Sequence, residues 1–197
     1  PSRNDEYLLY QTLLGSFQEE GDDGDPARGL AVYAERIERY MLKAARESKS
    51  RTSWISRDPA YESALAGFVR GVLAPSASNP FLDDLREQMR TIAWFGALNS
   101  LAMVTLKYTV PGVPDLYQGN ECFDFSLVDP DNRRPVDFER RSAMLESVEQ
   151  RVHDEGVCAV AASLSRDPRA DAAKMFVTWR LLQMRRARAA SPSSPRA

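Results

Sequence analysis

One β-type segment stands among helical patterns, and it constrains the fold of this 197-residue chain more than any other feature. Residues 108–110 (YTV) are aromatic and β-branched, which is typical of a strand. Pro111 and Pro114 then exclude a helix. We predict one short buried strand that leads into a loop. A lone strand lacks partners for its backbone hydrogen bonds, so we expect elements that pair with it to be missing from this chain.

The other segments carry the 3.6-residue hydrophobic period of amphipathic helices. We predict six helices, located after an N-cap at Ser2 or Asn4, over residues 30–44, from Pro59 to Val72, over residues 81–106 after a cap at Asn79, around residues 138–152, and around residues 175–188. The acidic, glycine-containing residues 19–25 are expected to end the first helix. The fourth is apolar on nearly every side beyond Trp94, so we expect its burial on all sides.

Composition excludes several classes of function. There are 26 basic and 28 acidic side chains, so the formal charge of −2 gives no attraction to nucleic acid or to a membrane surface. His153 is the sole histidine, which rules out a His-rich metal site. Cys122 and Cys158 are expected to be small buried residues rather than ligands or a redox pair. We predict no metal and no organic cofactor.

Neither a membrane span nor a signal peptide is indicated. No apolar run approaches the roughly 20 residues that cross a bilayer, and the first residues are polar and charged. We therefore expect a cytoplasmic protein.

Several motifs occur in a fixed order along the chain. Residues 111–121 read PGVPDLYQGNE, residues 124–137 read DFSLVDPDNRRPVD, and residues 4–15 read NDEYLLYQTLLG. Thr52-Ser53-Trp54 and residues 176–182 (FVTWRLL) complete the set. Together they resemble the C-terminal portion of maltooligosyl trehalose synthase, a branch of the α-amylase family, over about residues 1–188.

The resemblance implies a mainly α chain: a helical subdomain over residues 1–107, and the last strand–loop–helix elements of an incomplete (β/α)8 barrel over residues 108–188. Active-site loops lie at the C-terminal rim of such a barrel. Composition predicts a disordered tail over residues 189–197.

The resemblance also implies an isomerase reaction of carbohydrate metabolism, in trehalose biosynthesis. This glucosylmutase activity converts the reducing-end α-1,4 linkage of a maltooligosaccharide into an α,α-1,1 linkage. Retention of configuration requires two carboxyl groups roughly 5–5.5 Å apart, and in the family these lie on earlier barrel strands. The one His-Asp pair here, His153-Asp154, lies in an amphipathic helix and is interpreted as solvated. We predict no catalytic residue, and an isolated chain that is an inactive fragment.

Eleven residues are candidates for sugar contact in the intact enzyme. Trp54 and Tyr117 offer flat apolar faces, and polar neighbours offer directed donors or acceptors. The polar candidates are Lys49, Thr52, Ser53, Asp115, Gln118, Glu121, Asp129, Arg133 and Arg134. Structural roles stay open: Trp54 in a core, Asp115 in a turn, and the two arginines as ion-pair anchors.

A second hypothesis also stays open: a non-catalytic helical module that binds sugar or another protein, with self-association through exposed apolar surface. The basic residues between Arg180 and Arg188 are interpreted as a solvated helix face. Oligomeric state and preferred oligosaccharide length do not follow from the sequence.

Overall fold

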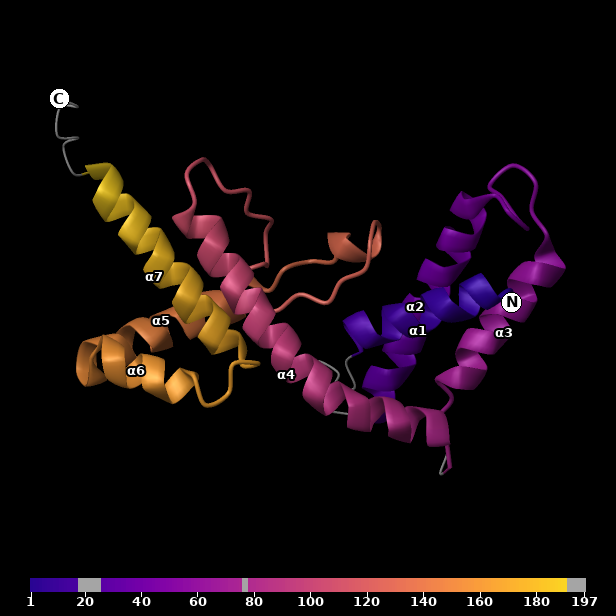
Figure 1. Ribbon diagram of the computed structural model, residues 1–197, viewed down its shortest axis with the longest axis horizontal. Helices are drawn as coiled ribbons and strands as arrows, with labels where there is room; N and C mark the ends of the chain where they lie inside the picture. Colours follow the sequence, from indigo (N-terminus) through magenta and orange to yellow (C-terminus); the bar gives the residue numbers. More distant parts are fainter. Residues whose placement is uncertain (18–25, 76–77, 191–197) are drawn as a thin grey trace. The chain divides into compact units, whose positions relative to one another are not determined.

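The computed structural model describes residues 1–17, 26–75 and 78–190, and those residues form helices and loops without a strand (Figure 1). The elements are α1 (Arg3–Ser16), α2 (Pro26–Ser48), α3 (Pro59–Val72), α4 (Pro80–Thr109), the 3₁₀ helix η1 (Asp131–Arg133), α5 (Phe138–Glu155), α6 (Val157–Leu164) and α7 (Asp171–Ala190). The mainly α prediction is confirmed. Residues 19–25 and most of the predicted tail, 191–197, lie outside the described residues.

The contacts divide the chain into two compact units. Unit 1 contains residues 1–90 and 125–134, and unit 2 contains residues 91–124 and those from 135 onward. Helix α4 contributes its first part to unit 1 and the remainder to unit 2. The predicted domain bounds of 1–107 and 108–188 stay a prediction.

Side-chain caps define where the helices of unit 1 begin. Ser2 Oγ accepts from the Asp5 amide at 3.2 Å while the Ser2 amide donates to Asp5 Oδ2 at 2.8 Å, which forms a capping box for α1. Asp58 accepts from the Tyr61 amide at the start of α3, and Asn79 accepts from the Leu82 amide at the start of α4. The predicted caps at Ser2 and Asn79 are confirmed.

The core of unit 1 lies where α1, α2, α3 and the first turns of α4 meet. Its members follow the predicted helical period, and Leu9, Ile37 and Leu65 are fully buried. One polar contact crosses the core: the hydroxyl oxygens of Ser16 and Tyr33 lie 2.9 Å apart. Because the apolar face of α2 is fully used in this core, its polar face is left to form other contacts.

The predicted strand at residues 108–110 is wrong. Tyr108 and Thr109 belong to α4, and the Val110 amide donates to Leu106 O at 3.0 Å in helical register. Thr109 Oγ1 also donates back to Thr105 O at 2.8 Å. The hydrogen bonds of a long apolar helix outweigh the β preference of three residues. Helix α4 ends at Thr109, because Pro111 disfavours helical backbone angles at Val110. Residues 108–110 therefore give no indication that pairing strands are missing from this chain.

Unit 2 packs α5, α6 and α7 around Val148, Val160 and Phe176. Helix α6 was not predicted, because eight residues of mostly small and apolar side chains carry too little period to separate them from α5. Gly156, with a φ of 85°, ends α5 and starts α6. Cys122 is buried as expected, whereas Cys158 is exposed and that part of the prediction is wrong.

Within this chain α4 is not buried on all sides, and its burial by further protein stays a prediction. In unit 2 its side chains Phe95, Met103 and Leu106 are 59%, 70% and 61% exposed. Only one side is covered, where Ala97 and Tyr108 are buried. No helix in the described ranges is long and apolar enough to cross a membrane. Among the same residues no group of three or more metal-ligating side chains is found.

Candidate functional site

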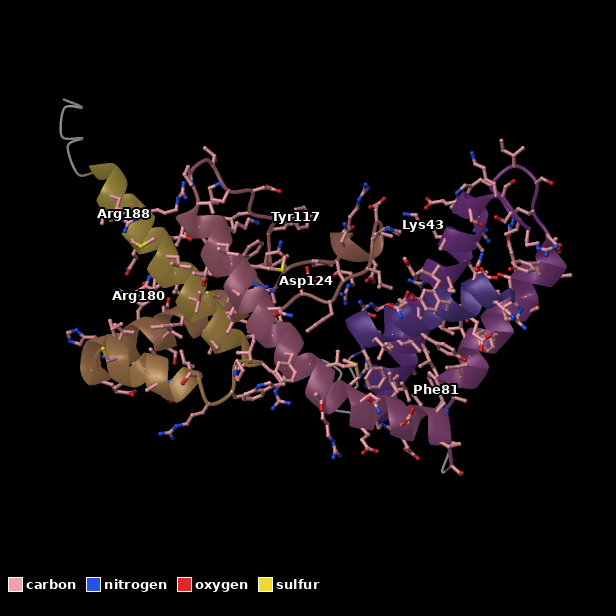
Figure 2. All side chains as sticks on the ribbon, in the orientation of Figure 1. Lys43, Phe81, Tyr117, Asp124, Arg180 and Arg188 are labelled. Atoms are coloured by element: carbon pink, nitrogen blue, oxygen red, sulfur yellow. The ribbon has the colours of Figure 1, made fainter. Side chains whose placement is uncertain are left out.

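A pocket of about 480 Å³ lies within unit 1. One wall is the polar face of α2, the second is Trp54 in the loop before α3, and the third is the segment that contains η1. Figure 2 labels Lys43 on α2, where it points toward the η1 segment. The lining side chains include Arg36, Tyr40, Lys43, Arg46, Asp131 and Arg134.

The Trp54 wall is held by a closed turn. The Ser53 amide donates to Ser56 O at 2.9 Å, and the Ser56 amide donates to Ser53 Oγ at 2.8 Å. Thr52, which is buried, accepts from the Asp58 amide at 3.0 Å. These bonds fix both sides of Trp54, whose side chain is 55% exposed.

Glu62 in α3 holds this loop against α2. Its carboxylate accepts two bonds from Arg46 at 3.0 and 2.8 Å, one from Thr52 Oγ1 at 2.8 Å, and an ion pair from Arg57. The bonds from Arg46 and Arg57 hold the pKa of Glu62 well below its usual range. The Arg46 guanidinium also lies 4.9 Å from the centre of the Trp54 ring, so one arginine connects the buried carboxylate to the exposed ring.

The opposite wall is held by Asp131 at the start of η1. Arg36 donates two bonds to its carboxylate, both at 2.9 Å, and a third to Phe125 O at 3.0 Å. The Leu127 amide adds a bond of 2.7 Å. Burial alone would raise the pKa of Asp131, but these hydrogen bonds hold it below the usual value. Lys43 donates to Asp129 O from the same helix face.

The pocket therefore combines aromatic faces with charges that are already paired. Its three carboxylates are each engaged by an arginine: Glu35 by Arg39, Asp131 by Arg36, and Asp129 by Arg133. Paired carboxylates are poor nucleophiles and poor proton donors, whereas directed donors beside a flat ring suit a neutral polyhydroxyl ligand. The arrangement is suited to binding rather than to bond cleavage.

The structure brings three predicted residues to this pocket: Trp54, Asp129 and Arg134. Thr52 and Ser53 hold the Trp54 loop instead of lining the pocket. Lys49 and Arg133 are exposed and do not line it, although Arg133 forms an ion pair with Asp129. The ion-pair role left open for Arg133 and Arg134 is seen in both residues.

Residues of the α2 wall were missed. None of the α2 residues that line the pocket, among them Arg36, Tyr40, Lys43 and Arg46, was a candidate. A polar helix face looks the same in sequence whether water or a distant loop covers it. No local signal in the sequence separates the two cases.

The other predicted residues lie in unit 2, in the segment between α4 and α5. Asp115, Tyr117 and Gln118 are exposed there. Glu121 forms an ion pair of 2.7 Å with Arg141 of α5. Figure 2 labels Tyr117 in this loop. None of the four lines the unit 1 pocket.

Comparison with known proteins gives the relationship. No family model matches the sequence. A Mycobacterium tuberculosis protein (strain CDC 1551 / Oshkosh) with the provisional name maltooligosyl trehalose synthase is 36% identical over 142 residues, which are 72% of this chain and 17% of the relative. A crystal structure of a maltooligosyl trehalose synthase is 33% identical with a TM-score of 0.74, over 95% of this chain and 23% of that one.

A second solved structure, maltooligosyltrehalose synthase from Arthrobacter ramosus, is also 33% identical, with a TM-score of 0.72 over 93% of this chain and 21% of that one. This chain thus spans about a fifth of the length of the relatives it matches. The likeness in sequence and in fold confirms the resemblance that the motifs predicted. The chain is therefore a homologue of part of the maltooligosyl trehalose synthases.

Proposed function

We propose that this chain works as one portion of an enzyme that converts the reducing-end α-1,4 linkage of a maltooligosaccharide into an α,α-1,1 linkage. The identity of 33–36% to proteins of that name supports it. The proposal includes a cytoplasmic location and an intact enzyme in which residues 108–188 belong to a barrel. The catalytic carboxylates are contributed by other parts of that enzyme, so this chain alone is inactive.

The role proposed for this chain is to bind the sugar in the unit 1 pocket. The observation that carries this role is the Trp54 ring at the pocket, held by Arg46 on one side and by a closed turn on the other. A pyranose ring presents apolar C–H faces and a rim of hydroxyls. The C–H faces pack on an aromatic ring, and the hydroxyls bond to arginines and lysines along α2.

The test of binding is a calorimetric titration of the chain with maltohexaose. We expect weak binding that Trp54→Ala abolishes or lowers at least about fivefold, since loss of one aromatic face removes roughly 1 kcal/mol. The matched control is Ile55→Ala, because Ile55 is 99% exposed and does not line the pocket. Equal affinity of the Trp54→Ala variant and the wild type would remove Trp54 from the site.

The test of inactivity uses the same sugar. We expect no trehalosyl product on incubation of the purified chain with maltohexaose. Product formed in proportion to chain concentration would contradict the claim that the catalytic carboxylates lie elsewhere.

The exposed apolar side of α4 favours a second candidate function, self-association as a helical module. Phe95, Met103 and Leu106 are the exposed residues concerned. Contiguous apolar surface of this kind is typical of interfaces. Sedimentation of wild type and Met103→Lys separates the candidates: a dimer that the substitution dissociates favours the module, and a monomer in both cases excludes it.

A further inference from the structure

The segment between α4 and α5 is held at one end by a single arginine of α7. Arg185 Nη1 donates to Tyr108 O at 2.9 Å and to Val110 O at 3.3 Å, and its Nη2 donates to Gly112 O at 2.5 Å. Tyr108 lies in the last turn of α4, whose final carbonyls have no partner within the helix. A positive charge at that end also complements the helix dipole. Arg185 is therefore not part of a solvated face, in contrast to the sequence-based interpretation.

The other end of the segment is held by the first turn of the same helix. Lys174 Nζ donates to Cys122 O at 2.8 Å and lies 5.1 Å from the centre of the Phe123 ring. Asp171 accepts from the Phe123 amide at 2.9 Å. Lys174 is only 7% exposed, and burial lowers the pKa of its ammonium group. A buried lysine committed to a backbone carbonyl has few arrangements open to it.

Between these two attachments the loop is exposed. Val113 is 98% exposed and Tyr117 47%. Arg141 connects the later part of the loop to α5, because its Nη2 donates to Gly119 O at 3.5 Å and it forms an ion pair of 2.7 Å with Glu121. At 1.5 Å per residue, the 14 steps from Asp171 to Arg185 measure about 21 Å along the axis of α7. The nine residues between Gly112 and Cys122 could extend to about 30 Å, which exceeds that length, so the attachments to α7 limit how far apart the two ends of the loop lie.

We propose that Arg185 and Lys174 are positioning residues, with α7 as the frame that sets the separation of the two ends of the loop at residues 110–123. The frame presents Tyr117 on a loop of defined shape. The sequence marks Tyr117 as a candidate for sugar contact. That contact is additional to the unit 1 pocket and rests on the proposed function; the frame itself does not. The guanidinium is needed at position 185 because three carbonyls at different directions are met by a planar fork and not by a single ammonium.

The experiment compares amide hydrogen exchange in the full chain for wild type, Arg185→Lys and the control Arg186→Lys. Arg186 is the exposed neighbour of Arg185 on the same helix. We expect exchange of the amides in the last turn of α4, and of Val110, which donates to Leu106 O, to accelerate about tenfold in Arg185→Lys, from loss of the charged hydrogen bonds to Tyr108 O and Val110 O. It should stay unchanged in Arg186→Lys and in residues 52–58 of every variant. Lys174→Met should accelerate residues 119–123 instead.

A general structural role predicts a different pattern. If Arg185→Lys lowers Tm and accelerates α5, α6 and α7 together with the end of α4, or leaves the last turn of α4 and Val110 unchanged, the frame is refuted. A maltohexaose titration of the same variants adds the functional readout: affinity should fall in Arg185→Lys while Tm and the exchange of α5 to α7 are retained. If the wild type binds no sugar, the binding role proposed above is contradicted. The exchange pattern still tests whether α7 acts as the frame.

Discussion

Two loops of this chain are held in opposite ways. The loop at residues 52–58 depends on one buried carboxylate, Glu62, that collects donors from Thr52, Arg46 and Arg57. The loop at residues 110–123 depends on cations of α7 that donate to backbone carbonyls. In the first case removal of the central side chain leaves cations without their partner. In the second case, removal of the lysine or arginine leaves backbone carbonyls that water can reach. The first arrangement should therefore be the more sensitive to substitution.

The largest effect is expected in the core beneath the first loop. Ile37→Ala should lower the free energy of unfolding by about 2–5 kcal/mol, since it leaves a cavity in a fully buried site. Urea unfolding measures the loss. Hydrogen exchange then shows whether α5, α6 and α7 of unit 2 lose protection too. If they do, the two loops belong to one cooperative structure and should not be compared as independent regions.

A smaller but pH-dependent effect is expected for Glu62→Gln. The folded-state pKa of Glu62 is depressed from its reference value of 4.5, so its contribution to stability is fully present above that pH and is lost as pH falls toward the folded pKa. The difference in Tm between wild type and Glu62→Gln should therefore narrow as the solution is acidified below pH 4.5. A difference that stays constant with pH would mean that ionisation of Glu62 does not hold the first loop.

Arg46→Lys should have an intermediate effect of about 1 kcal/mol on unfolding. Lysine keeps the charge but loses one of the two bonds to Glu62 and the planar stacking on Trp54. The fluorescence of the Arg46→Lys variant should show that Trp54 is more exposed to solvent. A Trp54→Phe variant gives the contribution of Trp94 and Trp179, which is subtracted. An unchanged Trp54 spectrum would indicate that the turn at Ser53 and Ser56 holds the ring without help from α2.

The smallest effect is expected at the rim of the pocket. Arg133→Ala should change stability by less than about 0.5 kcal/mol, because both partners of its ion pair with Asp129 are substantially exposed. Arg36→Ala provides the contrast, since the fork from Arg36 to Asp131 is largely buried. Equal melting temperatures for these two variants would show that the η1 segment is not held by Arg36.

Local signals in the sequence predicted much of the fold and less of the site. The capping box at Ser2, the cap at Asn79 and the regular apolar period of α2 are contained within a few turns, so they can be read directly. The strand at 108–110 was wrong because three residues of β preference were weighed against a helix whose end they form. Propensity is a weak signal beside the hydrogen bonds of the preceding turns.

The pocket could be predicted only in part. Trp54, Asp129 and Arg134 were candidates because their motifs resemble a known family, and they do line it. The contact that forms its wall, between Arg36 and Asp131, joins positions 95 residues apart. Nothing local in either residue points to the other. The same holds for Arg185, whose three acceptors are backbone carbonyls and carry no side-chain signature.

The separation of 95 residues between Arg36 and Asp131 also sets the order in which the two walls of the pocket are synthesised. Unit 1 is built from two separate stretches, and Arg36 needs Asp131 to complete its pairing. At a synthesis rate of about 5–20 residues per second, a ribosome releases Arg36 some 5–20 s before Asp131. The helices α1 to α3 can associate during that delay, whereas the η1 wall arrives only afterwards. In the living cell this pocket is thus the last part of its unit to be completed.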